Sequence, residues 1–149
     1  MNISQKDFLL LISSLNFKNK TIVFDMDRTL IIEDISILMM NHYGYLKQYD
    51  DLIKKAQSQE DIVEAYKFSV KCFAGHSQED LQITLNQFLK KDLYRDYLIN
   101  VIQKILQDKG NVIILSASWI FFVKQVIQSL NQLFHVNITQ YYGSTMKHN

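Results

Sequence analysis

Two spacings of apolar residues alternate along this chain, and they distinguish short strands from longer helices. The segment "SQKDFLLLISSL" repeats apolar residues at helical intervals behind the serine–acid spacing of a capping box, which predicts a helix over residues 4–15. Two uninterrupted apolar runs, Thr21 to Phe24 and Val112 to Leu115, are typical of short strands, and the first is expected to be covered on both faces. A third strand is predicted in "VNITQYYG", ending at Gly143.

A long helical block separates the first two strands. From Ile35 to Leu106 the apolar positions follow helical spacing almost without interruption. Strands that alternate with helices predict an α/β fold with a Rossmann-like parallel sheet and right-handed crossovers. Because the block is longer than one crossover needs, we expect residues 34–92 to form a helical cap inserted after the first strand. Residues 1–33 and 93–149 would then form the α/β core.

Composition narrows the class of protein. With 149 residues and 48% hydrophobic content the chain can bury one sizeable core, and its net charge of +1 gives no case for nucleic acid or an anionic membrane as partner. The single cysteine, Cys72, cannot form an internal disulfide, which favours a reducing compartment. The run "FLLLIS" is too short to span a bilayer, and no cleavage-type signal follows it. The sequence therefore predicts a soluble, cytoplasmic protein.

The candidate chemistry lies directly after the strands. Asp25, Asp27 and Thr29 follow the first strand, and Ser116 to Ser118 follow the second. Ligands of an open parallel sheet bind beyond the carboxyl ends of the strands, so both sets would meet if the two strands are neighbours. Two carboxylates this close repel each other unless a divalent cation or a shared proton offsets the repulsion. Oxygen ligands favour Mg²⁺, whereas the four histidines have no metal-ligand spacing.

Simpler interpretations of these residues stay open. Asp25 and Asp27 could be solvated carboxylates at the end of a strand, and Ser116 could be the N-cap of the next helix. Glu33 and Asp34 could be acids of a first helical turn, where the helix dipole favours them.

Two segments of the chain resemble a known family. "FDMDRTL" resembles the first signature of the haloacid dehalogenase (HAD) superfamily, and "VIILSAS" is similar to its second, an apolar strand that ends in Ser or Thr. The helical block between them is similar to the C1-type cap of the phosphoserine-phosphatase-like branch, and the resemblance covers roughly Thr21 to Thr145. Two further elements of the family are missing from it. A lysine and paired aspartates that the family carries further along have no counterpart, since only Lys124 and Lys147 follow Ser116 and no acid follows Asp108.

The resemblance implies a Mg²⁺-dependent phosphomonoester hydrolase that acts on a small phosphorylated substrate. It implies that Asp25 is the nucleophile and Asp27 the general acid and base, and that both hold Mg²⁺. The residues implied to bind phosphate or substrate are Thr29, Ser116, Ala117 and Asp34.

The missing lysine and aspartates leave a second hypothesis open. The chain could be a catalytically inactive HAD-like module that binds phosphate or a protein, because each loss would cost about two orders of magnitude in rate. Without a further strand beside it, the strand from Thr21 to Phe24 would also be an exposed apolar edge. We therefore expect either a homodimer through this edge or an N-terminal helix that folds over it.

Overall fold

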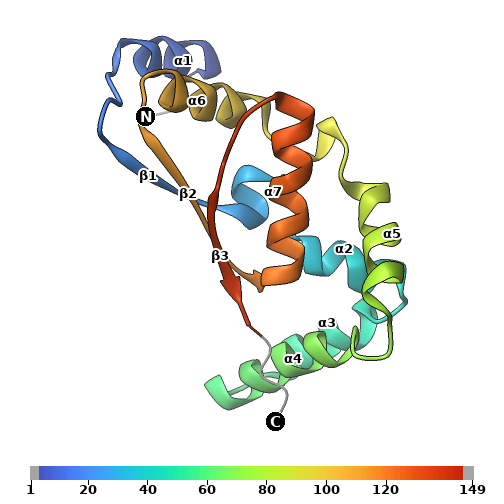
Figure 1. The fold of residues 1–149 in the computed structure, drawn as a ribbon. Helices are drawn as coiled ribbons and strands as arrows, with labels where there is room; N and C mark the ends of the chain where they lie inside the picture. Colours follow the sequence, from blue (N-terminus) through green and yellow to red (C-terminus); the bar gives the residue numbers. More distant parts are fainter. Residues whose placement is uncertain (1–3, 146–149) are drawn as a thin grey trace. The chain divides into compact units, whose positions relative to one another are not determined.

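The computed structural model describes residues 4–145 and divides them into two units (Figure 1). Residues 4–32 and 90–145 form one unit, here called the α/β unit, and residues 33–89 form the other, the helical unit. Lys147 lies outside the described residues.

The α/β unit is built on three parallel strands in the order β1-β2-β3. They are β1 (Thr21–Asp25), β2 (Asn111–Trp119) and β3 (Gln140–Ser144). This order confirms the predicted α/β fold with a parallel sheet, and among the described strands it places β1 at an edge. The predicted end of the second strand at Leu115 is wrong, because β2 continues to Trp119, which pairs with Ser144 after a shift in register.

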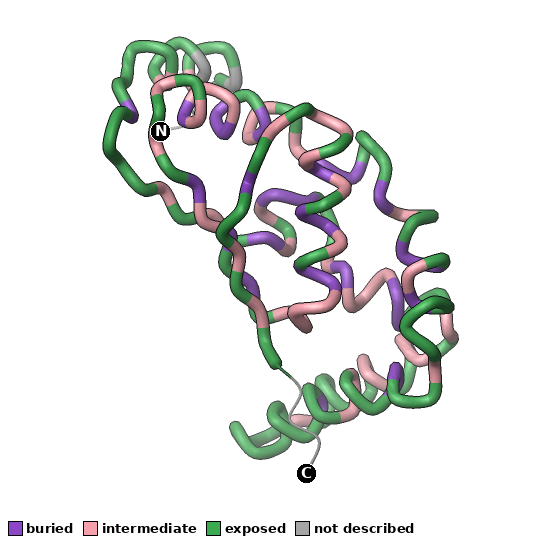
Figure 2. The backbone as a smooth tube through the Cα atoms, viewed as in Figure 1, coloured by how far each residue is buried: buried purple, intermediate pink, exposed green. Residues whose placement is uncertain are grey.

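Both helices that connect these strands pack on one face of the sheet. α6 (Asp96–Gln107) leads into β2, and α7 (Ile120–Phe134) connects β2 to β3. Because the strand order never reverses, two right-handed crossovers place their helices on the same side. Along β2, Val112, Ile114 and Ser116 are accordingly buried, and the residues between them are intermediate or exposed (Figure 2). The core between the sheet and these helices includes Met26, Leu30, Ile102, Ile105, Ile114, Phe122 and Val126.

Within the described residues of the α/β unit, no helix covers the opposite face of the sheet. Val23, Leu115 and Tyr142, one from each strand, are 56%, 53% and 56% exposed. The expectation that the strand from Thr21 to Phe24 is covered on both faces is therefore wrong for the described residues of this unit. A continuous apolar run does not reveal on which face of the sheet the connecting helices pack.

The N-terminal helix packs on another helix. α1 (Gln5–Ser14) begins at the N-cap Ser4, whose hydroxyl accepts a hydrogen bond from the Asp7 amide. The Phe8 ring meets Tyr97 of α6 edge-on, with centroids 6.0 Å apart. α1 therefore lies against α6, and Val23 of β1 stays exposed, so the expected cover over the first strand is not seen.

The helical unit consists of α2 (Ile35–His42), α3 (Leu46–Lys55), α4 (Gln59–Lys71) and α5 (Gln78–Phe88). α4 and α5 begin at Ser58 and Ser77, whose side chains accept amide hydrogen bonds as N-caps. Inside the unit, the Tyr43 hydroxyl lies 3.0 Å from Thr84 Oγ1, and the Tyr43 ring lies against His76. Among the described helices of the chain, none combines the length and apolar content needed to cross a membrane.

Candidate functional site

The predicted site residues of the two strands lie at one edge of the sheet. Asp25 is the last residue of β1 and pairs in register with Leu115, which immediately precedes Ser116 in β2. The chain then enters the turn η1 (Met26–Leu30), which carries the second carboxylate and the threonine. The carboxyl ends of β1 and β2 thus bring the two sequence segments together.

The turn η1 is anchored at both ends by buried side chains. Met26 and Leu30 are fully buried, and the Ile31 amide donates to the Met26 carbonyl at 3.0 Å, which closes the turn. Between these anchors Asp27 is extended and Arg28 adopts a left-handed conformation, with φ of 59°. A left-handed residue other than glycine is uncommon and strained, so the backbone at this position is held by its surroundings.

Each carboxylate is bound by hydroxyl groups. Thr29 Oγ1 donates to Asp25 Oδ2 at 2.8 Å. Ser116 Oγ and Ser118 Oγ both donate to Asp27 Oδ2, each at 2.8 Å. The Ser118 amide in turn donates to Ser116 Oγ at 2.9 Å. Hydrogen bonds to a carboxylate are stronger than neutral ones, so these contacts orient both acids.

Ser116 and Ser118 belong to a strand, not to a helix start. Side chains two apart in a strand point to the same face, so both hydroxyls reach one carboxylate. α7 begins at Ile120 with Trp119 at its N-cap, and the interpretation of Ser116 as a helix cap is therefore wrong. Ser118 was expected at this edge of the sheet, but no role was predicted for it. The Ser-x-Ser spacing of "LSAS" is the signal that could have identified it.

Ala117 takes part in the contact between β2 and β3 through its main-chain carbonyl. Its carbonyl accepts a hydrogen bond from Ser144 Oγ of β3. Next to it, the Cα of Gly143 comes so close to β2 that an added Cβ would lie 2.9 Å from the Ser118 carbonyl oxygen and from Ile120 Cα. Strand β3 therefore supports the end of β2 that carries the two serines.

Arg95 fixes the other end of the site turn, and nothing in the sequence pattern identified it. Its guanidinium donates to the Arg28 carbonyl at 3.1 Å, and its amide donates to the Leu30 carbonyl at 3.0 Å. The Ile32 amide donates to the Leu93 carbonyl at 2.9 Å. Leu93 ends the short helix η2 (Lys91–Leu93), so this part of the chain ties the turn down after Asp27.

Asp34 belongs to the helical unit and caps α2. Its carboxylate accepts from the amides of Ser36 at 2.9 Å and Ile37 at 3.1 Å. The simpler interpretation, an acid that stabilises the start of a helix, accounts for these contacts. A contact between Asp34 and a substrate stays a prediction, as do the phosphate contacts of Thr29, Ser116 and Ala117.

Asp25 and Asp27 are the acidic residues of this site that could hold a metal ion. Among residues 4–145, no three or more His, Cys, Asp or Glu side chains gather closely enough to hold a metal ion. Mg²⁺ in phosphate-handling sites commonly takes one or two carboxylates and completes its shell with water and substrate phosphate. The oxygen ligands of Asp25 and Asp27 therefore fit Mg²⁺ in kind, without forming a complete cage.

Comparison with known proteins identifies the fold. Family profiles and curated proteins give no match to the sequence. Among solved structures, the chain is similar to a HAD-family hydrolase from Salmonella enterica serovar Typhi, with a TM-score of 0.67 and 18% identity over 87% of this chain and 42% of that one. A protein of unknown function from Bordetella pertussis Tohama I gives a TM-score of 0.67 and 15% identity over 89% of this chain and 63% of that one.

A phosphoserine phosphohydrolase-like protein from Francisella tularensis is also similar, with a TM-score of 0.57 and 14% identity over 84% of this chain and 57% of that one. The chain therefore spans less than two thirds of the length of each of these proteins. At such identities the likeness concerns the fold. The chain has a HAD-like fold, with a parallel sheet and a helical unit inserted after the first strand.

Proposed function

We propose that this chain is a phosphomonoester hydrolase that uses Asp25 as its nucleophile. The observation that carries the proposal is the pair of carboxylates at the carboxyl edge of the sheet, each oriented by hydroxyl groups. The likeness in fold to a phosphoserine phosphohydrolase-like protein supports this reaction class and a small phosphorylated molecule as substrate. The free, buried Cys72 is consistent with a cytoplasmic setting.

In the proposed first step, an Asp25 carboxylate oxygen attacks phosphorus and the ester P–O bond breaks. Asp27 gives a proton to the departing alcohol, and an aspartyl-phosphate remains on Asp25. In the second step Asp27 takes a proton from water, the water oxygen attacks phosphorus, and the bond to Asp25 breaks to release phosphate. Thr29 would keep the Asp25 carboxylate aligned, and Ser116 and Ser118 would do the same for Asp27.

Asp25 would hold Mg²⁺ through its carboxylate and Asp27 through its main-chain carbonyl. When bound, the ion would supply positive charge that offsets the carboxylates and the phosphoryl oxygens. Phosphoryl transfer depends mainly on positioning and on such charge stabilisation, so turnover is expected to be low without it.

Hydrolysis of p-nitrophenyl phosphate in the presence of Mg²⁺ tests the proposal. Asp25→Asn should lower the rate by about a thousandfold or more, because the amide cannot act as the nucleophile. Asp92→Asn is the matched control, since Asp92 is an exposed acid of the same unit, and it should leave the rate unchanged. Equal rates for the wild type and Asp25→Asn would contradict the proposal.

The second candidate is a module that binds phosphate without turnover. The absence of a third metal-ligating side chain beside Asp25 and Asp27, within the described part of the chain, favours it. In that case the amide NMR signals of residues 116–118 should shift with inorganic phosphate, and Ser116→Ala should reduce the shift, while no hydrolysis is detected. Hydrolysis that depends on Asp25 would exclude this candidate.

A further inference from the structure

The main chain on the two sides of Asp27 is held in different ways. Before it, the fully buried side chain of Met26 anchors the start of η1. After it, Arg28 is exposed and adopts the left-handed conformation, with φ of 59° and ψ of 3°. Because this conformation is unfavourable for any residue other than glycine, Arg28 needs a contact that keeps it there.

Arg95 supplies that contact from outside the turn. Its guanidinium donates to the Arg28 carbonyl at 3.1 Å. The direction of this carbonyl is set by the ψ angle of Arg28, so the hydrogen bond favours the left-handed conformation over those that turn the carbonyl away. A charged donor also forms a stronger hydrogen bond than a neutral one.

The main chain of Arg95 is itself firmly held. Arg95 is the N-cap residue of α6, and its carbonyl accepts from the amides of Leu98 at 2.9 Å and Ile99 at 3.1 Å. The preceding residue, Tyr94, is buried, and its hydroxyl donates to the Val126 carbonyl at 3.0 Å. The guanidinium therefore reaches the site turn from the start of a helix that is packed into the core.

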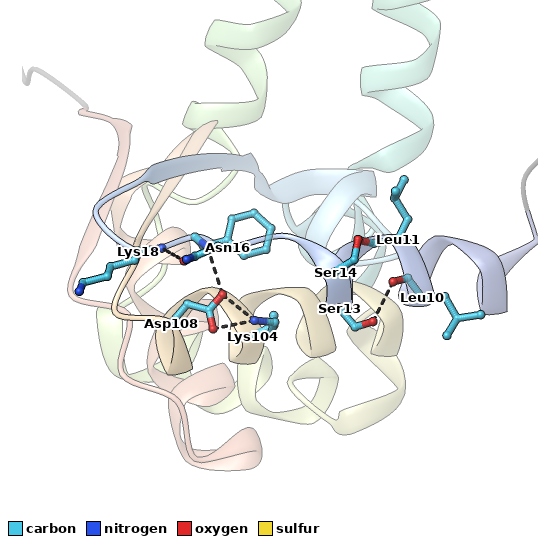
Figure 3. A network of polar contacts seen from close by, with 9 residues as sticks. Leu10, Leu11, Ser13, Ser14, Asn16, Lys18, Lys104 and Asp108 are labelled. Atoms are coloured by element: carbon cyan, nitrogen blue, oxygen red, sulfur yellow. Dashed lines mark hydrogen bonds and ion pairs between the residues drawn. The ribbon is translucent and has the colours of Figure 1, made fainter.

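The other end of α6 is fastened as well. Lys104 Nζ contacts both carboxylate oxygens of Asp108 at 2.6 Å (Figure 3). Asp108 Oδ2 also accepts from the Phe17 amide at 3.1 Å, which ties the end of the helix to the segment before β1. α6 is thus fixed at both ends within the α/β unit, and Arg95 acts on the turn from a fixed base.

We infer that Arg95 is a positioning residue for Asp27 in the hydrolysis proposed above, on which this inference rests. By holding the Arg28 carbonyl, Arg95 fixes the main chain that follows Asp27. The Asp27 carboxylate is then presented where the hydroxyls of Ser116 and Ser118 bind it. Arg95 acts through the main chain of the turn and contributes no atom to the reaction itself.

The effect of this positioning depends on the alcohol that leaves. In the first step Asp27 gives a proton to the departing oxygen while the P–O bond breaks. An alkoxide needs that proton, whereas p-nitrophenolate is a stable anion and leaves without it. A displaced Asp27 should therefore slow the cleavage of an alkyl ester much more than that of p-nitrophenyl phosphate. A partly unfolded protein would lose both activities in the same proportion.

The pair p-nitrobenzyl phosphate and p-nitrophenyl phosphate tests the inference, because the two esters are similar in shape and differ in the leaving group. For the full chain with Mg²⁺, Arg95→Ala should lower kcat/KM about ten- to a hundredfold for the benzyl ester and no more than about threefold for the phenyl ester. Lys91→Ala is the matched control, since Lys91 is an exposed cation of the nearby η2, and it should change neither value. Circular dichroism should show native folding in both variants, because the main-chain contacts of Arg95 remain.

The outcomes separate this inference from the proposed function. If hydrolysis depends on Asp25 but Arg95→Ala slows both esters equally, or slows neither, the reaction class stands and the positioning role is overturned. A wild type that cleaves the phenyl ester but not the benzyl ester also overturns it, because Asp27 then gives no proton. Equal rates for the wild type and Asp25→Asn contradict the proposed function, and the positioning role falls with it.

Discussion

A short motif predicted the position of the two aspartates but not their hydrogen-bond partners. Carboxylates directly after an apolar strand predicted that Asp25 and Asp27 lie at the edge of a sheet, and the structure places them there. The sequence did not predict that Ser116 and Ser118 would share one oxygen of Asp27, nor that Arg95 would bind the Arg28 carbonyl. Those contacts join segments far apart in the chain, and periodicity carries no information about them.

Arg28 provides a test of strain in the site turn. Its φ of 59° lies in the left-handed region, where glycine has no steric penalty and other residues lose about 1 kcal/mol or more. We expect Arg28→Gly to have a free energy of unfolding about 0.5–1 kcal/mol higher than Arg28→Ala, because both lack the guanidinium and only glycine relieves the strain. Urea denaturation of the two variants measures the difference. A variant Arg28→Gly that is less stable than Arg28→Ala would contradict this account.

At the scale of elements, the sequence predicted the existence of the three strands better than their ends, since the third strand was expected from Val136 and β3 begins at Gln140. The first strand was placed within one residue of β1, because its apolar run and its hydrogen-bonded pairing coincide. The end of β2 was missed, because Ser116 and Ser118 are polar although the strand continues. Hydropathy reports which side chains are buried, whereas the extent of a strand follows from main-chain pairing with β3.

The contact of β3 with β2 can be tested at Gly143. A Cβ added there would lie 2.9 Å from the Ser118 carbonyl oxygen and from Ile120 Cα, and these backbone atoms cannot rotate away as a side chain would. Gly143→Ala should lower the free energy of unfolding by about 1–3 kcal/mol, as overpacking does. Gly75→Ala is the control, since a Cβ added there meets no atom within 4 Å, and it should change stability by no more than about 0.5 kcal/mol. Equal effects of the two substitutions in thermal or urea unfolding would show that β3 can move away from β2 at little cost.

At the scale of the whole molecule, alternation of strands and helices was sufficient to predict the fold class, whereas the expectation that the first strand lies at an edge came from the family resemblance and not from hydropathy. The run from Thr21 to Phe24 would look the same in a central strand and in an edge strand. Since the order β1-β2-β3 of the described strands never reverses, both connecting helices share one face, and Val23, Leu115 and Tyr142 are exposed on the other. The uncovered face is thus a consequence of topology, which local hydropathy does not encode.

Tyr94 links the stability of the α/β unit to alkaline pH. Its ring is buried and its hydroxyl donates to the Val126 carbonyl at 3.0 Å, so ionisation would leave a charge in an apolar core. Burial raises the pKa of Tyr94 from its ordinary value of 10.0 to about 12, while a hydrogen bond from Ser129 acts in the opposite direction. Because the pKa is higher in the folded chain than in the unfolded chain, the stabilisation is complete below pH 10. It is lost as the pH rises from 10 towards 12, by about 1.4 kcal/mol per pH unit at most.

The variant Tyr94→Phe isolates this contribution. Near pH 8 it should be about 1 kcal/mol less stable than the wild type, because the hydrogen bond to Val126 is lost. Phenylalanine does not ionise, so the difference should shrink above pH 10 and vanish near pH 11. Urea unfolding at a series of pH values measures both curves. Parallel curves up to pH 11 would mean that Tyr94 ionises as easily in the folded chain as in the unfolded one, which its burial and its hydrogen bond to the Val126 carbonyl of α7 do not allow.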